Sequence, residues 1–193
     1  MLSISNVLEM IEDEGEDRVK QVLSSFISDN YGVEQFIKNN AIEFAKKKWS
    51  ITYLVSDSET KALLGIFTLA VKGVQINPSM NMSNKMSRKI REFSLDKNNN
   101  SSKTTSTAFL LAQFSKNAKC KNKITGDDLM EEALKALKNV QTRVGGKLLW
   151  LECEEDNINA LNFYQHDNYG FRKFNTRHDT ESNITYIQMI KII

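Results

Sequence analysis

Three lysines alternate with other residues in a short loop, the pattern in this sequence with the clearest chemical meaning. The loop reads Lys119-Cys120-Lys121-Asn122-Lys123-Ile124-Thr125-Gly126. An apolar run from Ala108 to Ala112 precedes the loop. The last residue of the loop, Gly126, opens an amphipathic segment. The first N–H groups of a helix have no partner within the helix, so they can bind a phosphate together with nearby lysines. The sequence therefore predicts an anion-binding loop between a strand and a helix.

The other reactive side chains form no motif for metal or nucleophilic chemistry. His166 and His178 have no ligand spacing with each other or with cysteine, so we expect no metal. Cys120 and Cys153 lie in unlike contexts, which indicates a reducing compartment rather than a disulfide framework. The sequence contains no P-loop, no dinucleotide-binding glycine pattern and no nucleophile elbow. Nucleotide hydrolysis, redox and serine hydrolase chemistry therefore lack support.

Composition and charge are those of an ordinary globular protein. The chain has 193 residues, of which 40% are hydrophobic and 26% charged, and its formal net charge is +2. This length predicts a single domain over residues 1–193. The nearly balanced charge gives no indication of bulk nucleic-acid binding. The N-terminus turns acidic at Glu9 and no apolar run is long enough to span a bilayer, so we expect a cytoplasmic protein without membrane contact.

The first half of the chain is predicted to form helices followed by a hairpin. Apolar residues recur three and four positions apart from Val19 to Ile27 and from Val33 to Ala45, which predicts two amphipathic helices. From Ile51 the period changes to two, and a polar turn leads to a second apolar run from Ala62 to Val71. This change predicts a β-hairpin with a buried second strand.

A polar, basic insertion at residues 79–106 separates this hairpin from the loop. It contains a predicted helix from Asn84 to Phe93 and a low-complexity run from Asp96 to Ser102. The helix carries four basic residues, namely Lys85, Arg88, Lys89 and Arg91. Two interpretations of these basic residues are open: they form a solvated helix face, or they contact a nucleic acid.

The helix after the loop is the best-marked element of the chain. Thr125 and Asp128 form a capping-box pattern, apolar residues line one face as far as Val144, and Gly145-Gly146 is expected to end the helix in the left-handed conformation. Leu148 to Cys153 then predicts a strand parallel to the one before the loop.

The last forty or so residues are predicted to form a short helix and two closing strands. The helix is expected from Asn157 to His166, and the strands from Phe171 to Phe174 and from Ile184 to Ile190.

Two of these segments resemble motifs of the Gcn5-related N-acetyltransferase (GNAT) superfamily. The better match is Asn157-Ile158-Asn159-Ala160-Leu161-Asn162-Phe163-Tyr164 followed by Gly170-Phe171, where the family pattern is N-x-x-A-x-x-hydrophobic-Y with Gly-Phe shortly after. The family loop is Q/R-x-x-G-x-G/A, of which this chain keeps only Gly126, with Lys121 and Ile124 replacing the other two conserved types. The first half also resembles, more weakly, the subgroup of acetyltransferase toxins that act on charged transfer RNA.

The resemblance implies a fold and a set of site residues. The fold is of the α/β (α+β) class, a mixed twisted sheet of about six to seven strands flanked by helices, with a splayed strand pair that forms the acetyl-CoA cleft. In this chain the implied residues fall into two sets. Backbone amides would bind the cofactor at Phe114, Ser115 and Lys116 and at Lys121, Asn122, Lys123, Ile124, Thr125, Gly126 and Asp127.

The implied catalytic residues lie farther along the chain. Tyr164 would bind the cofactor close to its sulfur and protonate the departing thiolate, and Asn157 would bind the pantetheine arm. Glu152 would act as the general base through water, although a solvated strand end is the other interpretation of this residue. Tyr164 could also be a core tyrosine bonded to a backbone carbonyl.

The implied activity is acetyl-CoA-dependent N-acetylation of a primary amine by direct attack on the thioester. The acceptor is left open among a small molecule, a protein and an aminoacyl-tRNA. The alternative function is a regulatory module that binds acyl-CoA with little or no turnover, for which the lost loop glycine is the main argument. The oligomeric state, monomer or homodimer, is also open.

Overall fold

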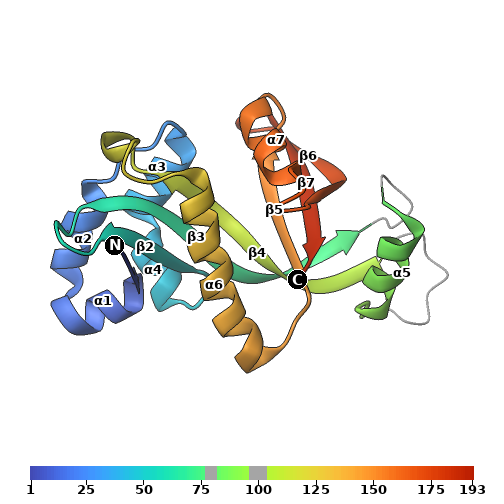
Figure 1. Cartoon of the computed structure of the whole chain (residues 1–193), viewed down its shortest axis with the longest axis horizontal. Helices are drawn as coiled ribbons and strands as arrows, with labels where there is room; N and C mark the ends of the chain where they lie inside the picture. Colours follow the sequence, from blue (N-terminus) through green and yellow to red (C-terminus); the bar gives the residue numbers. More distant parts are fainter. Residues whose placement is uncertain (77–81, 96–103) are drawn as a thin grey trace. The chain divides into compact units, whose positions relative to one another are not determined.

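The computed structural model describes residues 1–76, 82–95 and 104–193 (Figure 1). Their strands form one sheet in the order β1-β2-β3-β4-β5-β7-β6. The β4–β5 pair is parallel, whereas the β1–β2, β2–β3, β5–β7 and β6–β7 pairs are antiparallel. The predicted α/β class with a mixed sheet is therefore confirmed. The low-complexity run from Asp96 to Ser102 lies outside the described residues.

The chain divides into two compact units. Unit 1 comprises Met1–Ala70 and Leu111–Gly145, and unit 2 comprises Val71–Leu110 and Gly146–Ile193. Strands β3 (Leu63–Ile76) and β4 (Thr104–Lys116) each contribute residues to both units.

The strands of unit 1 are β1 (Leu2–Asn6), β2 (Ile51–Asp57) and parts of β3 and β4. The predicted hairpin of β2 and β3 is confirmed, with Thr52 opposite Thr68 and their buried hydroxyls 2.8 Å apart. Tyr53 stacks on Phe67 beside them, with ring centroids 4.9 Å apart. Sequence periodicity did not predict β1, because its alternation of apolar and polar residues covers only Leu2 to Ser5; the strand adds to the sheet by pairing with β2.

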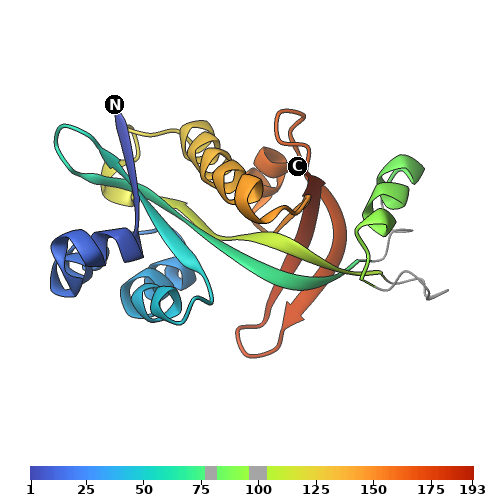
Figure 2. The same cartoon turned by 90° about the horizontal axis from the view of Figure 1, so that it is seen from below.

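The helices of unit 1 are more numerous than the periodicity indicated. They are α1 (Val7–Glu14), α2 (Glu16–Ser24), α3 (Tyr31–Asn39), α4 (Ala41–Lys46) and α6 (Gly126–Val144). The prediction of one continuous helix over Val33–Ala45 is wrong, because the chain breaks at Asn40, whose N–H caps α3 by donating to Phe36 O over 2.8 Å. Apolar side chains of α1 to α4 still pack in one core with Leu54 and Ile66. Figure 2 shows α1 to α4 on one face of the unit 1 strands and α6 on the other.

Unit 2 consists of the remaining parts of β3 and β4 with five further elements. These are α5 (Asn84–Glu92), β5 (Leu148–Glu154), α7 (Ile158–Gln165), β6 (Arg172–Asp179) and β7 (Ile184–Ile192). The parallel register of β4 and β5 covers Phe109↔Leu149 and Leu110↔Trp150, which confirms the predicted parallel pairing. The core of this unit includes Ile76, Ile90 and Phe174, each at most 1% exposed.

The glycine pair after α6 has a different backbone conformation from the one predicted. Gly145 has φ +76° but ψ −160°, so its conformation is not left-handed helical as expected, although its positive φ still favours glycine. Gly146 has φ +99°, and a Cβ there would lie 2.7 Å from the Phe109 ring. Both positions therefore require glycine where the chain passes from α6 to β5.

Candidate functional site

The loop for which the sequence predicts anion binding lies in unit 1 and joins β4 to α6, as expected. A 3-10 turn, η1 (Ala118–Cys120), begins it. Asn117, only 4% exposed, fixes the start of the loop: its N–H and side-chain Nδ2 donate to Leu64 O and Leu63 O over 2.7 and 2.8 Å. Its Oδ1 accepts from Lys119 N. The sequence did not predict this role of Asn117. The only signal for it was the position of a single asparagine between a strand and a basic loop.

The other end of the loop is fixed by the predicted capping box of α6. The N–H and hydroxyl of Thr125 donate to Asp128 Oδ2 over 2.9 and 2.7 Å, and Asp128 N–H donates to Thr125 Oγ1 over 3.0 Å. These bonds to Thr125 lower the pKa of the Asp128 carboxyl. The Asp128 carboxylate is therefore ionised at neutral pH, and it is bonded to Thr125 in the cap.

The capping box and the turn decide which backbone amides remain for an anion. Thr125 N donates to Asp128, and Lys123 N donates to Cys120 O over 2.9 Å. Of the other five predicted loop positions, four have N–H groups that make no hydrogen bond within the described part of the chain: those of Lys121, Asn122, Ile124 and Gly126. The loop therefore has such N–H groups near both of its ends, and they could bind an anion. They are fewer than the sequence predicted.

The connection between α2 and α3 lies along this loop. Ala118 N donates to Ile27 O over 2.8 Å, and the Ser28 and Ser115 hydroxyls are 2.9 Å apart. The Lys121 ammonium forms an ion pair with Asp29 at 2.8 Å, and Lys119 Nζ donates to Ser25 O over 3.2 Å. Two of the three loop lysines are therefore engaged by this connection, a contact that no sequence signal indicated. We call residues 25–29 the strap.

Close packing fixes the end of β4 and the inner side of the loop. A Cβ on Gly65 of β3 would lie 3.1 Å from Leu129 Cδ1 of α6 and 3.3 Å from Ser115 O of β4. Glycine thus permits two strands and the helix to approach closely. The predicted positions Phe114 and Lys116 are half-buried. Ile124, at the position of the family's first glycine, is 3% exposed, so its side chain belongs to the interior rather than to the solvent side of the loop.

The predicted catalytic tyrosine lies on α7 in unit 2. Asn157 caps this helix, with its Oδ1 accepting from Ala160 N over 3.1 Å, so only its amide nitrogen is left to donate to a ligand. Gly170, at φ +65°, turns the chain so that Phe171 N donates to Tyr164 O over 3.2 Å. The Phe171 ring then meets the Tyr164 ring edge to face at 5.9 Å. This contact explains why the tyrosine and the later Gly-Phe pair form one motif.

Tyr164 is suited to donate a proton rather than to accept one. It is 8% exposed, and burial, with a smaller effect from nearby Cys153, raises the pKa of its phenol above the ordinary value. The phenol therefore stays protonated throughout the physiological pH range.

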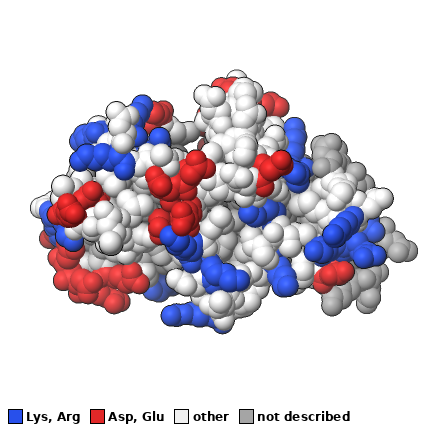
Figure 3. Space-filling view, in the orientation of Figure 1, with Lys and Arg blue, Asp and Glu red and all other residues white. Residues whose placement is uncertain are grey.

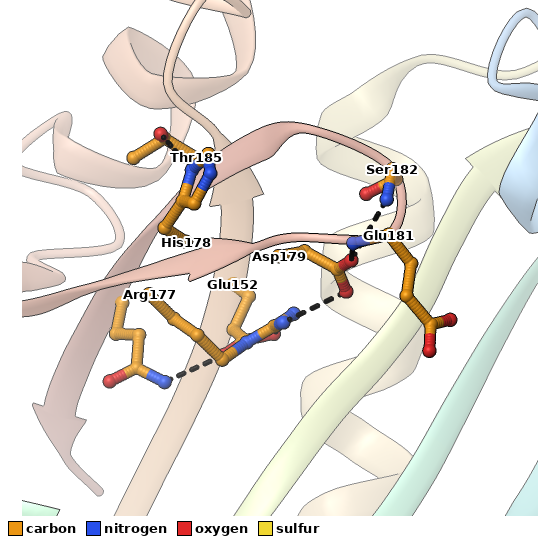
Figure 4. A network of polar contacts seen from close by, with 8 residues as sticks. Glu152, Arg177, His178, Asp179, Glu181, Ser182 and Thr185 are labelled. Carbon is orange, nitrogen blue, oxygen red and sulfur yellow. Dashed lines mark hydrogen bonds and ion pairs between the residues drawn. The ribbon is translucent and has the colours of Figure 1, made fainter.

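Glu152 lies in a network of polar side chains on β5, β6 and β7 (Figure 4). Arg177 Nε and Nη2 donate to its two carboxylate oxygens over 3.0 and 2.9 Å, and Gln188 Nε2 donates to Oε1 over 2.6 Å. Arg177 also bonds Asp179 and lies 4.5 Å over the Tyr186 ring. Burial alone raises the pKa of Glu152, but the bonds from Arg177 and Gln188 outweigh it and lower the pKa.

The predicted residues fall into two groups. The loop and strand residues from Phe114 to Asp127 belong to unit 1, and Glu152, Asn157 and Tyr164 belong to unit 2. Among the described residues there is no group of three or more His, Cys, Asp or Glu that could hold a metal. No described helix is long and apolar enough to cross a membrane.

Comparison with solved structures identifies the fold. A bacterial toxin matches with a TM-score of 0.69 and 14% identity over 100% of this chain and 91% of its own. AtaT complexed with acetyl-methionyl-tRNAfMet matches with a TM-score of 0.62 and 16% identity over 96% of this chain and 94% of its own. The chain has the GNAT fold. A tyrosine-to-phenylalanine mutant of KacT matches with a TM-score of 0.64 and 18% identity, over 96% of this chain and 93% of its own. No protein-family model and no curated protein matches the sequence.

Proposed function

We propose that this protein is an acetyl-CoA-dependent N-acetyltransferase whose acceptor is the amine of an aminoacyl-tRNA. The observation that carries the proposal is the fold match over nearly the whole chain to AtaT complexed with acetyl-methionyl-tRNAfMet. A second match, with a TM-score of 0.59 over 99% of this chain, is to AtaTR bound with AcCoA. Because identity is 14–16% in these comparisons, the assignment of activity depends on this chain's own residues.

The loop of unit 1 has the chemistry of a diphosphate site. Amides of Lys121, Asn122, Ile124 and Gly126 are available, and Lys119, Lys121 and Lys123 add positive charge. The substitution of glycine by Ile124 is compatible with this role, because the isoleucine side chain is buried and its N–H makes no hydrogen bond to the described residues. The main argument for a binding module without turnover is thereby weakened.

Tyr164 supplies the proton that the reaction requires. When an amine attacks the thioester carbonyl, the tetrahedral intermediate collapses and the coenzyme leaves as a thiolate. A phenol with a raised pKa holds its proton until a basic thiolate forms, and then donates it.

The demand on a general base depends on the acceptor. An α-amino group has a pKa of about 8, so roughly a quarter of it is already neutral near pH 7.5. Glu152 is ion-paired with Arg177 and has a lowered pKa, which makes it a weak proton acceptor. The role of Glu152 as general base stays a prediction. An aminoacyl acceptor needs little general-base catalysis, because part of its amine is already neutral.

A two-part experiment tests the function. Isothermal titration measures acetyl-CoA binding, and incubation of aminoacylated tRNA with radiolabelled acetyl-CoA measures transfer to the amine, with deacylated tRNA as the matched control. We expect binding and label transfer to the aminoacylated pool alone. Binding without transfer to any amine would favour the regulatory module, and absence of binding at millimolar acetyl-CoA would refute both.

A further inference from the structure

Helix α5 presents a basic face to solvent. Lys85, Arg88, Lys89 and Arg91 are all exposed, and Glu92 is the one acid within the helix. We call these four residues the basic face of α5. Figure 3 shows Lys and Arg side chains gathered over this helix. Two interpretations of such a face are a solvated surface and a site for a polyanion.

The opposite face of α5 is used in packing. Ile90 is fully buried and belongs to the core of unit 2, against which Met86 and Phe93 also pack. Basic amphipathic helices bind membranes by burying their apolar face in lipid, which this packing prevents. Only the charged face of α5 is left for a partner.

The helix is also fixed at both ends. The Ser83 hydroxyl accepts from Met86 N over 3.3 Å at its start. After its end, Leu95 N donates to Thr105 O over 2.9 Å, and Ser106 Oγ donates to Phe93 O over 3.2 Å. These bonds hold α5 against β4, so the cations project from a rigid element.

The four cations of the basic face have no counter-ion among the described residues. In the described residues, no carboxylate lies within 4.0 Å of any of them. Cations of α2 and α4, by contrast, pair with Glu14, Glu16 and Glu43. Unpaired cations spaced over six residues span about 9 Å along a helix, which is long enough to contact two or more phosphates of one strand.

We infer that the basic face of α5 binds the phosphate backbone of the acceptor RNA. The inference rests on the proposed function for the identity of the polyanion; the charge and rigidity of the face come from the structure. A contact to phosphates positions the RNA without reading its sequence. The basic face of α5 therefore sets affinity for tRNA as a class rather than preference for one tRNA.

A quadruple variant tests this inference directly. Lys85→Gln, Arg88→Gln, Lys89→Gln and Arg91→Gln together remove the face but leave Ile90, Met86 and Phe93 in place. The matched control removes four cations that have counter-ions, by Arg18→Gln, Lys20→Gln, Lys46→Gln and Lys47→Gln. Both variants change the net charge equally. Binding of deacylated tRNA is measured at several salt concentrations, and circular dichroism with acetyl-CoA titration verifies folding.

If two or three of the four cations contact phosphates, tRNA affinity of the α5 variant falls on the order of 100-fold near 0.1 M salt, and the slope of log K against log salt decreases by about 2. The control variant changes affinity less than about fivefold. Equal losses in the two variants would overturn the inference, because they would reflect net charge alone. Wild-type affinity for tRNA retained in the α5 variant would also overturn it, while aminoacyl-tRNA acetylation by the wild type would still uphold the proposed function. Stronger binding to anionic vesicles than to tRNA would refute RNA as the partner.

Discussion

Replacing Tyr164 by phenylalanine removes one oxygen atom and keeps the aromatic packing around it. The ring contacts with Phe163 and Phe171, at centroid distances of 5.4 and 5.9 Å, remain possible in the variant. We therefore expect a folded protein with unchanged affinity for acetyl-CoA. Loss of the general acid lowers kcat by a factor on the order of 100 to 10,000, the usual contribution of a positioned proton donor. KM for the acceptor stays nearly constant, because the phenol acts on the leaving group.

The assay for this variant is single-turnover acetyl transfer, with thiol release followed in the same reaction. Tyr169→Phe is the matched control, because Tyr169 belongs to the same aromatic cluster, 4.8 Å from the Phe163 ring centroid. Because burial raises the pKa of Tyr164, the wild type should show no loss of rate from ionisation of this phenol below about pH 10. A kcat for Tyr164→Phe within threefold of wild type, or an equal loss in Tyr169→Phe, would refute the general-acid assignment.

Two further variants test the environment of the site. Glu152→Gln breaks the pair with Arg177 and should destabilise the fold by about 1 kcal/mol at pH 7. Because the pKa of Glu152 is lowered in the folded state, this difference in stability should shrink progressively as pH falls below the ordinary carboxyl pKa of about 4.3 and be lost once the pH lies below the lowered pKa, which urea unfolding at several pH values measures. We expect its kcat with an aminoacyl acceptor to fall less than tenfold, and a loss of 100-fold or more would instead establish Glu152 as the base. Asp29→Asn frees Lys121 from the strap and should tighten acetyl-CoA binding up to about fivefold at low salt, as measured by isothermal titration. A gain that persists unchanged at 1 M salt would contradict this electrostatic explanation.

The sequence predicted those parts of the fold that depend on local patterns. The capping box of Thr125 and Asp128, the α5 helix and the β2–β3 hairpin all follow from spacing within a few residues, and each is confirmed. Strand β1 and the break at Asn40 were missed. Edge-strand pairing and the packing of two short helices are decided by distant contacts, which periodicity does not contain.

The candidate site shows the same division. The loop and the Tyr164 motif were recognisable because each is a continuous segment. The strap, the Asn117 anchor and the carboxylate network of Glu152 each join residues far apart in the sequence. The Arg177 pair in particular changes the interpretation of Glu152, since a carboxylate with two strong donors is a weaker base than the sequence alone would indicate.

The loop departs from the family pattern in two linked ways. A glycine at the position of Ile124 would let an anion approach from either side of the backbone, whereas the buried isoleucine leaves only the solvent side. Lys121 lies at the position of a glutamine or arginine and is held by Asp29 of the strap. An incoming diphosphate must therefore compete with Asp29 for this ammonium, so binding exchanges one ion pair for another. Under the proposed function, acetyl-CoA affinity therefore depends on the charge of the strap as well as on the loop amides.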